Sequence, residues 1–202
     1  GALTPIGNNV GAFLKGLQEG QSGAARITHF DPELFKTQIA CEVKDFNPAD
    51  FVDRREVRRL DRYAIYALVA ADEAIQHAGL NTEQLDLDRV GVIWASGIGG
   101  LRSLEEEIAY NATTETPRYN PFMIPKMIAN MGAGHISMKY GFRGPSYATV
   151  SACASTGHAL GAAADDIRLG RTDVMVVGGS EAAVVEVGIG GFSAMKAMST
   201  RN

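Results

Sequence analysis

Apolar residues recur along the chain with two different spacings. Between Leu60 and Gly79 they return every three or four positions, which places them on one stripe of a helix: Leu60, Ala64, Ala67, Leu68, Ala71 and Ile75. This spacing predicts a helix from about residue 54 to residue 78, with Gly79 as its stop signal. The segments RVGVIWASGIGG (89–100) and TDVMVVGGSEA (172–182) instead contain short, continuous apolar runs rich in β-branched residues. They predict two buried strands.

The remaining segments alternate between the two types of element. LRSLEEEIAY (101–110) predicts a helix, and a Pro-rich loop leads into another helix that begins at about Pro125 and ends near Gly141. SYATVSA (146–152) predicts a strand, and ASTGHALGAAADDIRLG (154–170) predicts a helix rich in small residues. Because strands alternate with helices, the connections are crossovers and the sheet is mostly parallel, with helices on both faces. The predicted fold class is α/β.

Neither end of the chain completes this pattern. GALTPIG (1–7) predicts a loop that leads into a helix with no strand before it, and SAMKAMSTRN (193–202) ends without a closing element. We therefore expect residues 1–202 to form one domain that is incomplete at both ends.

The composition, with 46% hydrophobic and 21% charged residues, is typical of a soluble globular protein. No apolar run approaches the roughly 18 residues of a membrane span, and the first residues lack the charged and apolar regions of a signal peptide. We therefore expect a cytoplasmic protein without membrane insertion. Cys41 and Cys153 are too few for a disulfide framework and are expected to be reduced. The four histidines lack the spacing of metal ligands, so no metal is expected.

The formal net charge of -4 argues against a general nucleic-acid binder. One basic segment stands out, DRREVRRLDRY (53–63), whose arginines recur at helical spacing and would share one face: Arg55, Arg58, Arg59 and Arg62. Two interpretations stay open. The arginines form a solvated helix face that is offset by neighbouring carboxylates, or they form a docking site for an acidic partner.

Cys153 lies where the predicted strand of residues 146–152 gives way to the following helix. At a helix N-terminus the free N–H groups and the positive end of the helix dipole favour the thiolate over the thiol. The neighbouring residues are small and leave room for a substrate to reach the sulfur: Ala152, Ala154, Ser155 and Gly157. The pattern favours a nucleophile. A structural role stays open, because free cysteine is among the most buried residue types.

Both apolar strands end in glycine-rich turns, within VIWASGIGG (92–100) and VMVVGGSEA (174–182). In an open α/β sheet the carboxyl ends of such strands border the usual ligand crevice, so these turns are expected to lie near the site. Dinucleotide binding by GIGG (97–100) is disfavoured, because the G-x-G-x-x-G spacing is absent and the following Glu105, Glu106 and Glu107 would repel a pyrophosphate. No cofactor is expected.

Five motifs, in order along practically the whole chain, carry a resemblance to a known family. They are SGIGGL (96–101), NMGAGHISMKYGFRGPS (130–146), VSACASTGHALG (150–161), VGGSEA (177–182) and GIGGFSAMKAMSTRN (188–202). The chain resembles the N-terminal half of a β-ketoacyl-[acyl-carrier-protein] synthase, closest to the type II condensing enzymes of bacterial fatty-acid synthesis. The resemblance implies a thiolase-like fold, in which two similar α/β halves stack as five layers, αβαβα, in a homodimer.

The same resemblance implies roles for particular residues. Cys153 would take an acyl chain from its carrier as a thioester, and its backbone N–H would contribute to an oxyanion hole. A carbanion from decarboxylated malonyl-carrier protein would then attack this thioester and lengthen the chain by two carbons. The acyl pocket would be lined by Ile98, Leu101, Met123 and Phe192. Acyl carrier protein, in its acyl and malonyl forms, would dock on Arg55, Arg58, Arg59 and Lys196.

The chain departs from the family pattern in its length and its histidines. Family members are longer and use two histidines and a lysine of the C-terminal half, which no histidine here matches; His135 and His158 are expected to be structural. Two alternatives to the fatty-acid enzyme stay open. One is a ketosynthase of polyketide synthesis, whose motifs overlap these, and the other is a non-catalytic fragment or partner such as a chain-length factor. Chain-length factors lack the cysteine, so Cys153 argues against the second.

Overall fold

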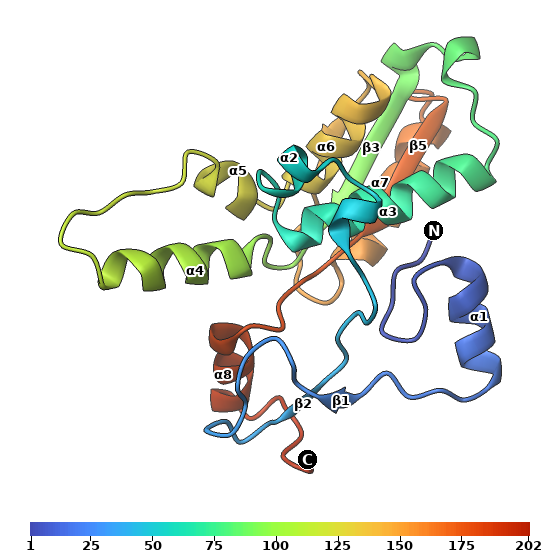
Figure 1. The fold of residues 1–202 in the computed structure, drawn as a ribbon. Helices are drawn as coiled ribbons and strands as arrows, with labels where there is room; N and C mark the ends of the chain where they lie inside the picture. The colour runs from blue at the N-terminus through green and yellow to red at the C-terminus, as the bar shows by residue number, and fades with distance from the viewer.

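A three-stranded parallel sheet forms the centre of the protein (Figure 1). The computed structural model describes residues 1–202. The strands are β3 (Val90–Ala95), β4 (Ser146–Tyr147) and β5 (Val174–Gly179), in the spatial order β4-β3-β5. β3 pairs with β5 along its whole length, from Val90 opposite Val174 to Ala95 opposite Gly179. Because the strands are parallel, the chain returns to the same end of the sheet through helices.

Helices cover both faces of this sheet, and the alternation of side chains along β3 decides which helix lies on which face. Val92 and Trp94 belong to a core cluster with two helices on one face. Ile93 and Ala95 pack on the opposite face against a third helix, which is rich in alanine. The three helices are α3 (Arg62–His77) and α6 (Met131–Tyr140) on the first face and α7 (Ser155–Arg168) on the second. All six residues of β3 are buried, as a strand covered on both faces requires.

The other elements lie outside this core. They are α1 (Val10–Gln18), β1 (Ala25–Arg26), β2 (Ile39–Ala40), α2 (Arg54–Val57), α4 (Leu101–Ala112), α5 (Met123–Met127), α8 (Glu186–Ala194) and 3-10 helices at Pro48–Asp50, Thr82–Gln84 and Leu87–Arg89. β1 and β2 form an antiparallel pair. In Figure 1, α1, β1, β2 and α8 lie together on one side of the core. In Figure 1, α4 and the loop after it project away from the sheet, and the chain returns through α5. None of the helices combines the length and the apolar character that crossing a membrane requires.

The predicted α/β class, the parallel sheet and the two buried strands are confirmed. The residues of the predicted apolar stripe, from Leu60 to Ile75, are all buried. The helix predicted from 54 to 78 is wrong in one respect, because it is divided into α2 and α3 by residues 58–61. Asp61 has an extended backbone (φ -81°, ψ 159°), and its side chain caps α3 by accepting a hydrogen bond from the Tyr63 N–H.

The helix predicted from about Pro125 to Gly141 is also divided. α5 ends before residues 128–130, because Ile128 is extended (ψ 134°) and its carbonyl accepts a hydrogen bond from the Tyr63 hydroxyl. α6 ends as predicted at Gly141, whose left-handed φ of 69° suits glycine. In both divided helices the apolar pattern continues across the break, so the pattern alone does not reveal it.

The strand predicted at residues 146–152 is shorter than expected, because only Ser146 and Tyr147 pair with β3. Two residues after Tyr147, the chain contacts α7 instead of β3. There the hydroxyl of Thr149 donates a hydrogen bond to the carbonyl of Ser155 at 2.8 Å. The side-chain bond to α7 replaces the sheet pairing that the β-like sequence predicts.

Asp61 also joins α3 to α4. One of its carboxylate oxygens accepts hydrogen bonds from the backbone N–H of Ser103 at 3.1 Å and from the hydroxyl of Ser103 at 2.7 Å. The residue is only 2% exposed. Its carboxylate therefore satisfies buried donors of two helices that are far apart in the sequence.

We expect Asp61→Ala to lower the free energy of unfolding by about 2–4 kcal/mol, because it leaves several buried donors without an acceptor. Urea denaturation of the intact protein measures this loss. Asp86→Ala is the matched control, because Asp86 is an exposed residue that caps only a short 3-10 helix, and a much smaller loss is expected. Equal losses in the two variants would contradict the role given to Asp61.

Candidate functional site

Cys153 is exposed and lies at the start of α7, whose N-cap is Ala154. The structure therefore places this cysteine at the helix start that the sequence pattern indicates. The preceding residue, Ala152, has a left-handed φ of 50°, which residues other than glycine seldom adopt. The amide N–H of Cys153 donates to no protein group. The turn thus presents both a thiol and a free backbone donor at a helix N-terminus.

Ser155 holds this turn together. Its buried hydroxyl accepts a hydrogen bond from the Ser151 N–H at 2.8 Å and donates one to the Ala152 carbonyl at 2.7 Å. One turn along α7, Nδ1 of His158 lies 2.6 Å from the hydroxyl of Ser151. Side chains of α7 therefore fix the chain just before Cys153, and His158 contributes to this support.

A cavity of about 390 Å³ opens beside Cys153. The turn after β3 (96–98) lines it, and so do the last residue of β5 with the turn after it (179–181) and Phe192 of α8. Both strand ends therefore meet at the carboxyl edge of the parallel sheet, where α/β proteins commonly bind ligands. Ile98 and Phe192, two of the predicted acyl-pocket residues, line this cavity and are 41% and 39% exposed.

The structure does not bring Leu101 and Met123, the other two predicted pocket residues, into the walls of this cavity. Leu101 begins α4, and its side chain lies next to Gly188 of α8. Met123 begins α5, through which the chain returns from the projecting segment towards the sheet. A role for these two residues in acyl binding stays a prediction.

Two side chains from distant segments hold the start of α8, the helix that carries Phe192. The carboxylate of Glu105 accepts a hydrogen bond from the Val187 N–H at 2.7 Å, and Nδ1 of His29 lies 3.3 Å from the Val184 carbonyl. Burial lowers the pKa of His29, although the neighbouring carboxylate of Glu42 acts in the opposite direction. The neutral imidazole is therefore favoured, with its Nδ1–H donated to the Val184 carbonyl.

Glu181 is a site residue that the sequence analysis did not identify. Its carboxylate accepts hydrogen bonds from the N–H of Gly97 at 2.8 Å, from the N–H of Ile98 at 3.1 Å and from the hydroxyl of Ser96 at 3.1 Å. The backbone donors of the glycine-rich turn are thus already occupied by an anion of the protein. This is a stronger reason against phosphate binding by GIGG than the three glutamates of α4, and the only sequence signal for it is an acidic residue directly after β5.

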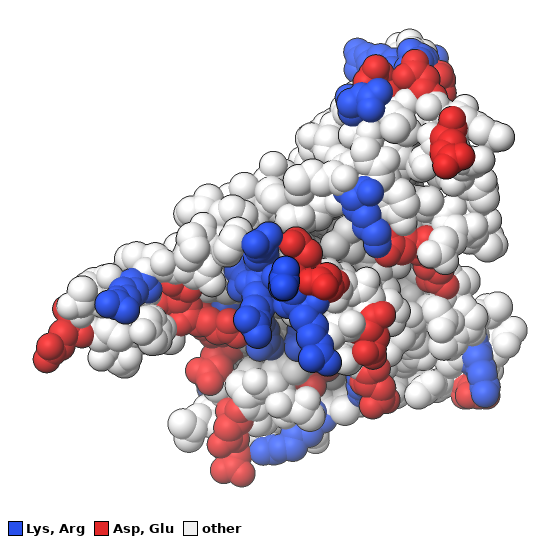
Figure 2. Space-filling view, turned by 45° about the horizontal axis from the view of Figure 1, so that its top comes forward, with Lys and Arg blue, Asp and Glu red and all other residues white.

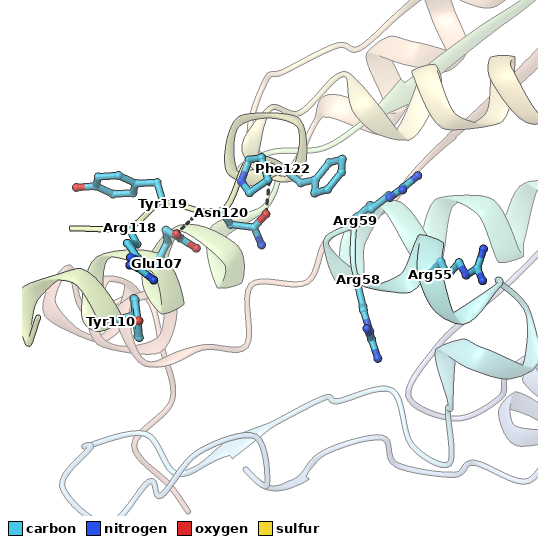
Figure 3. A pocket seen from close by; sticks show the side chains of 10 residues that line it. Arg55, Arg58, Arg59, Glu107, Tyr110, Arg118, Tyr119, Asn120 and Phe122 are labelled. Carbon is cyan, nitrogen blue, oxygen red and sulfur yellow. Dashed lines mark hydrogen bonds between the residues drawn. The ribbon is translucent and has the colours of Figure 1, made fainter. Parts of the chain in front are cut away.

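Three of the predicted docking residues line one hollow of about 660 Å³: Arg55, Arg58 and Arg59. We call this the basic hollow, and Figure 2 shows Lys and Arg side chains gathered near the middle of one face of the molecule. Arg118, which the sequence analysis did not single out, lines the hollow from the loop after α4, opposite α2 (Figure 3). Arg59 pairs with Glu56 at 3.1 Å and lies over the ring of Phe122. Arg55, Arg58 and Arg118 form no ion pair.

The structure separates two other basic residues from this group. Arg62 was expected to share the helix face of the other arginines, but it turns inward, with Nη1 3.0 Å from Nε2 of His29. Lys196 follows α8 and does not line the basic hollow. Arg62 is the first residue of α3, which the break at residues 58–61 separates from α2.

Comparison with known proteins identifies the family. The model of the β-ketoacyl synthase N-terminal domain matches residues 1–202. The chain therefore belongs to the β-ketoacyl synthase family, and the sequence resemblance is confirmed.

Among curated relatives, the 3-oxoacyl-[acyl-carrier-protein] synthase 2 of Synechocystis sp. is 40% identical over 202 residues, which is 100% of this chain and 49% of that protein. The protein of the same name from Staphylococcus aureus is 40% identical over 204 residues, with 100% of this chain and 50% of that protein covered. The chain thus spans about half the length of the curated relatives it matches.

Solved structures agree with this assignment. The ishigamide ketosynthase/chain length factor superposes with a TM-score of 0.90 at 26% identity, over 98% of this chain and 50% of that one. A β-ketoacyl synthase from Burkholderia phymatum gives a TM-score of 0.85 at 26% identity, over 99% of this chain and 49% of that one. The fold is therefore that of the N-terminal half of the thiolase-like ketosynthases, as the sequence predicted.

We expect Ala152→Val to destabilise the protein by about 2 kcal/mol, because a β-branched side chain strongly disfavours a left-handed backbone. Ala152→Gly should keep or slightly raise the stability, since glycine adopts this φ without strain. Ala154→Val is the matched control, because Ala154 is also exposed but has a φ of -88°. Chemical denaturation of the intact protein measures all three. If both valine variants lose the same stability, the turn is not strained at Ala152.

Proposed function

We propose that the intact protein containing this chain is a 3-oxoacyl-[acyl-carrier-protein] synthase that elongates acyl chains in fatty-acid synthesis. The observation that carries the proposal is Cys153, exposed at the N-terminus of α7 beside a cavity at the carboxyl edge of the sheet. The relatives of this name at 40% identity support it. Residues 1–202 are proposed to be one domain, which the rest of the intact protein completes. A cytoplasmic location belongs to the same proposal.

The proposed reaction has two acyl transfers. In the first, the Cys153 thiol loses its proton, and the resulting thiolate attacks the thioester carbon of an acyl carrier protein. The bond to the carrier sulfur breaks, and the carrier leaves as a thiolate that takes up the released proton. In the second, malonyl-carrier protein loses CO2, and the resulting carbanion attacks the acyl-cysteine carbon. The thiolate of Cys153 then leaves, which releases a 3-oxoacyl carrier two carbons longer. Covalent catalysis of this kind divides one difficult step into two easier ones.

The free N–H of Cys153 is suited to be one donor of an oxyanion hole in this scheme. In each transfer the carbonyl oxygen gains negative charge when the tetrahedral centre forms. A backbone donor fixed by the turn and without a protein acceptor can stabilise that charge without reorganising first. The helix N-terminus adds a favourable field at the same point.

A ketosynthase of polyketide synthesis is the second candidate, because the ishigamide ketosynthase/chain length factor superposes closely on this chain. The identity to that protein is 26%, against 40% to the fatty-acid synthases, which favours the fatty-acid enzyme. A non-catalytic chain-length factor is disfavoured by the presence of Cys153 itself.

The acyl carrier protein is the proposed partner at the basic hollow. Carrier proteins are strongly acidic, and fixed positive charges accelerate the encounter with an acidic partner. The three unpaired arginines there, Arg55, Arg58 and Arg118, leave their charges available for such a partner. Lys196 remains part of the proposal as a separate contact near α8.

A homodimer is also proposed, because large apolar side chains stay exposed on two parts of this chain. On α7 and the segment around it these are Tyr147, Val150, Leu160, Ile167 and Leu169. On the projecting segment they are Ile108, Tyr110, Tyr119, Ile124 and Ile128. Apolar surface of this extent is typical of faces that another domain or subunit covers.

Cys153 should be the acylated residue. Mass spectrometry of the intact protein after exposure to an acyl-carrier thioester is expected to show the adduct on the peptide of Cys153. Cys153→Ala should abolish both the adduct and condensation. Cys41→Ala is the matched control, because Cys41 is also exposed but does not line the cavity beside Cys153. An adduct on Cys41, or condensation by Cys153→Ala, would show that the assignment is wrong.

Charge reversal at Arg58 and Arg118 should raise the apparent KM for the carrier-bound substrate and weaken its dependence on salt, because the exposed charges that attract the carrier are reversed. Acylation by a small, carrier-free thioester should stay nearly unchanged. Lys15→Glu on α1 is the control, since Lys15 is exposed and does not line the basic hollow. If the small thioester loses activity equally, the variants have damaged the fold and the docking proposal fails.

A further inference from the structure

We propose that Glu181 is a positioning residue, which fixes the turn after β3 and thereby places Ile98 at the wall of the cavity beside Cys153. The inference rests on the proposed function, since its consequence is the selection of acyl-chain length. Glu181 itself borders this cavity and makes no hydrogen bond to Cys153. The proposed effect is exerted through the turn 96–99.

The carboxylate of Glu181 gathers the donors of this turn. Oε2 accepts from the N–H groups of Gly97 and Ile98 at 2.8 and 3.1 Å, and Oε1 accepts from the Ser96 hydroxyl at 3.1 Å. The same hydroxyl of Ser96 accepts a hydrogen bond from the Gly99 N–H at 3.0 Å. Glu181 is therefore the single acceptor on which three successive residues of the turn converge, and through Ser96 it also reaches the fourth.

The turn approaches Glu181 closely at Gly97. A Cβ atom at this position would lie 2.9 Å from Oε2 of Glu181, so the carboxylate would have to shift to accommodate a side chain there. The turn and the carboxylate are thus fitted to each other. Because Ile98 follows directly and lines the cavity, a shift of the Gly97 backbone would change the position of the Ile98 side chain at the cavity wall.

No cation competes for this carboxylate. Arg62 and Arg102 line a small neighbouring cavity of about 60 Å³ together with Glu181, yet neither forms an ion pair with it. Arg102 lies near Glu106, and Arg62 contacts His29. The carboxylate of Glu181 therefore has the backbone N–H groups of the turn as its partners, in the way that nests of N–H groups bind anions.

The first test is independent of activity and uses hydrogen exchange in the intact protein. Glu181→Ala should greatly accelerate exchange of the amides of Gly97 and Ile98, while the amides of β3 keep their protection. Glu186→Ala is the matched control, because Glu186 is an exposed glutamate five residues further on that makes no hydrogen bond to the turn. Unchanged exchange at residues 97 and 98 in Glu181→Ala would overturn the proposal.

The second test measures acylation of Cys153 and condensation with a series of acyl-carrier thioesters of increasing length. Ile98→Phe is the reference for a changed wall, because added bulk in the cavity should disfavour long chains more than short ones. Glu181→Ala should change the ratio of kcat/KM between long and short chains by about tenfold, the range expected when an apolar pocket changes by about one methylene. Glu181→Gln keeps one acceptor oxygen and should change the ratio less.

The outcomes separate this inference from the proposed function. If the wild-type protein is not acylated at Cys153 by any thioester, the proposed function is wrong. If it is acylated and Glu181→Ala loses activity equally at every chain length, Glu181 has only a general structural role and the inference is wrong. A changed length ratio in Glu181→Ala, with Glu186→Ala like wild type, supports it.

Discussion

The arrangement of the site depends on one strand that is paired on both edges and covered on both faces. β3 lies between β4 and β5, with α3 and α6 on one face and α7 on the other. Its parallel register with β5 sets Ala95 opposite Gly179, so the turns after the two strands emerge side by side. Trp94 then donates its Nε1–H to the Ser180 hydroxyl at 2.9 Å, and that hydroxyl donates to the Tyr63 carbonyl at 2.7 Å. The edge of the sheet that carries the cavity is thereby fixed to α3 as well as to β5.

Much of this framework was predictable because it follows from burial. A strand covered on both faces must be apolar throughout, and a helix against the sheet must carry an apolar stripe, so β3, β5 and α3 leave a clear pattern in the sequence. The breaks at Asp61 and Ile128 leave no mark in the apolar pattern. Asp61 is of a residue type that commonly caps helices, which is a local signal for a helix start. Its contact with Ser103, and the contact of Ile128 with Tyr63, involve residues that are distant in the sequence. Hydrophobic periodicity indicates which side of a helix or strand is buried. It does not indicate where a helix is interrupted because a backbone group bonds to the side chain of a distant residue.

The features of the candidate site also fall into those that the local sequence predicts and those that only the folded chain shows. The position of Cys153 at a helix start follows from the local sequence, and so does the presence of a basic group around Arg58. The inward turn of Arg62 towards His29, the addition of Arg118 from another segment and the contact of Glu181 with the turn after β3 depend on the tertiary fold. A sequence pattern can indicate which residue types suit a function, but partners separated by tens of residues become visible only when the chain is folded.

One segment connects the two surfaces on which the proposed function depends. Residues 96–127 leave the sheet at the cavity beside Cys153, extend through α4, and return through the loop that carries Arg118 and Phe122 to the basic hollow. The two ends of this segment are joined by a hydrogen bond, in which the Gly100 N–H donates to the Met127 carbonyl at 3.0 Å. On the return of the segment, at the start of α5, Arg59 of the α2–α3 connection lies over the ring of Phe122. A partner that binds at the basic hollow therefore contacts the same covalent segment whose first residues form the cavity wall, and the turn held by Glu181 is the point where that segment joins the sheet.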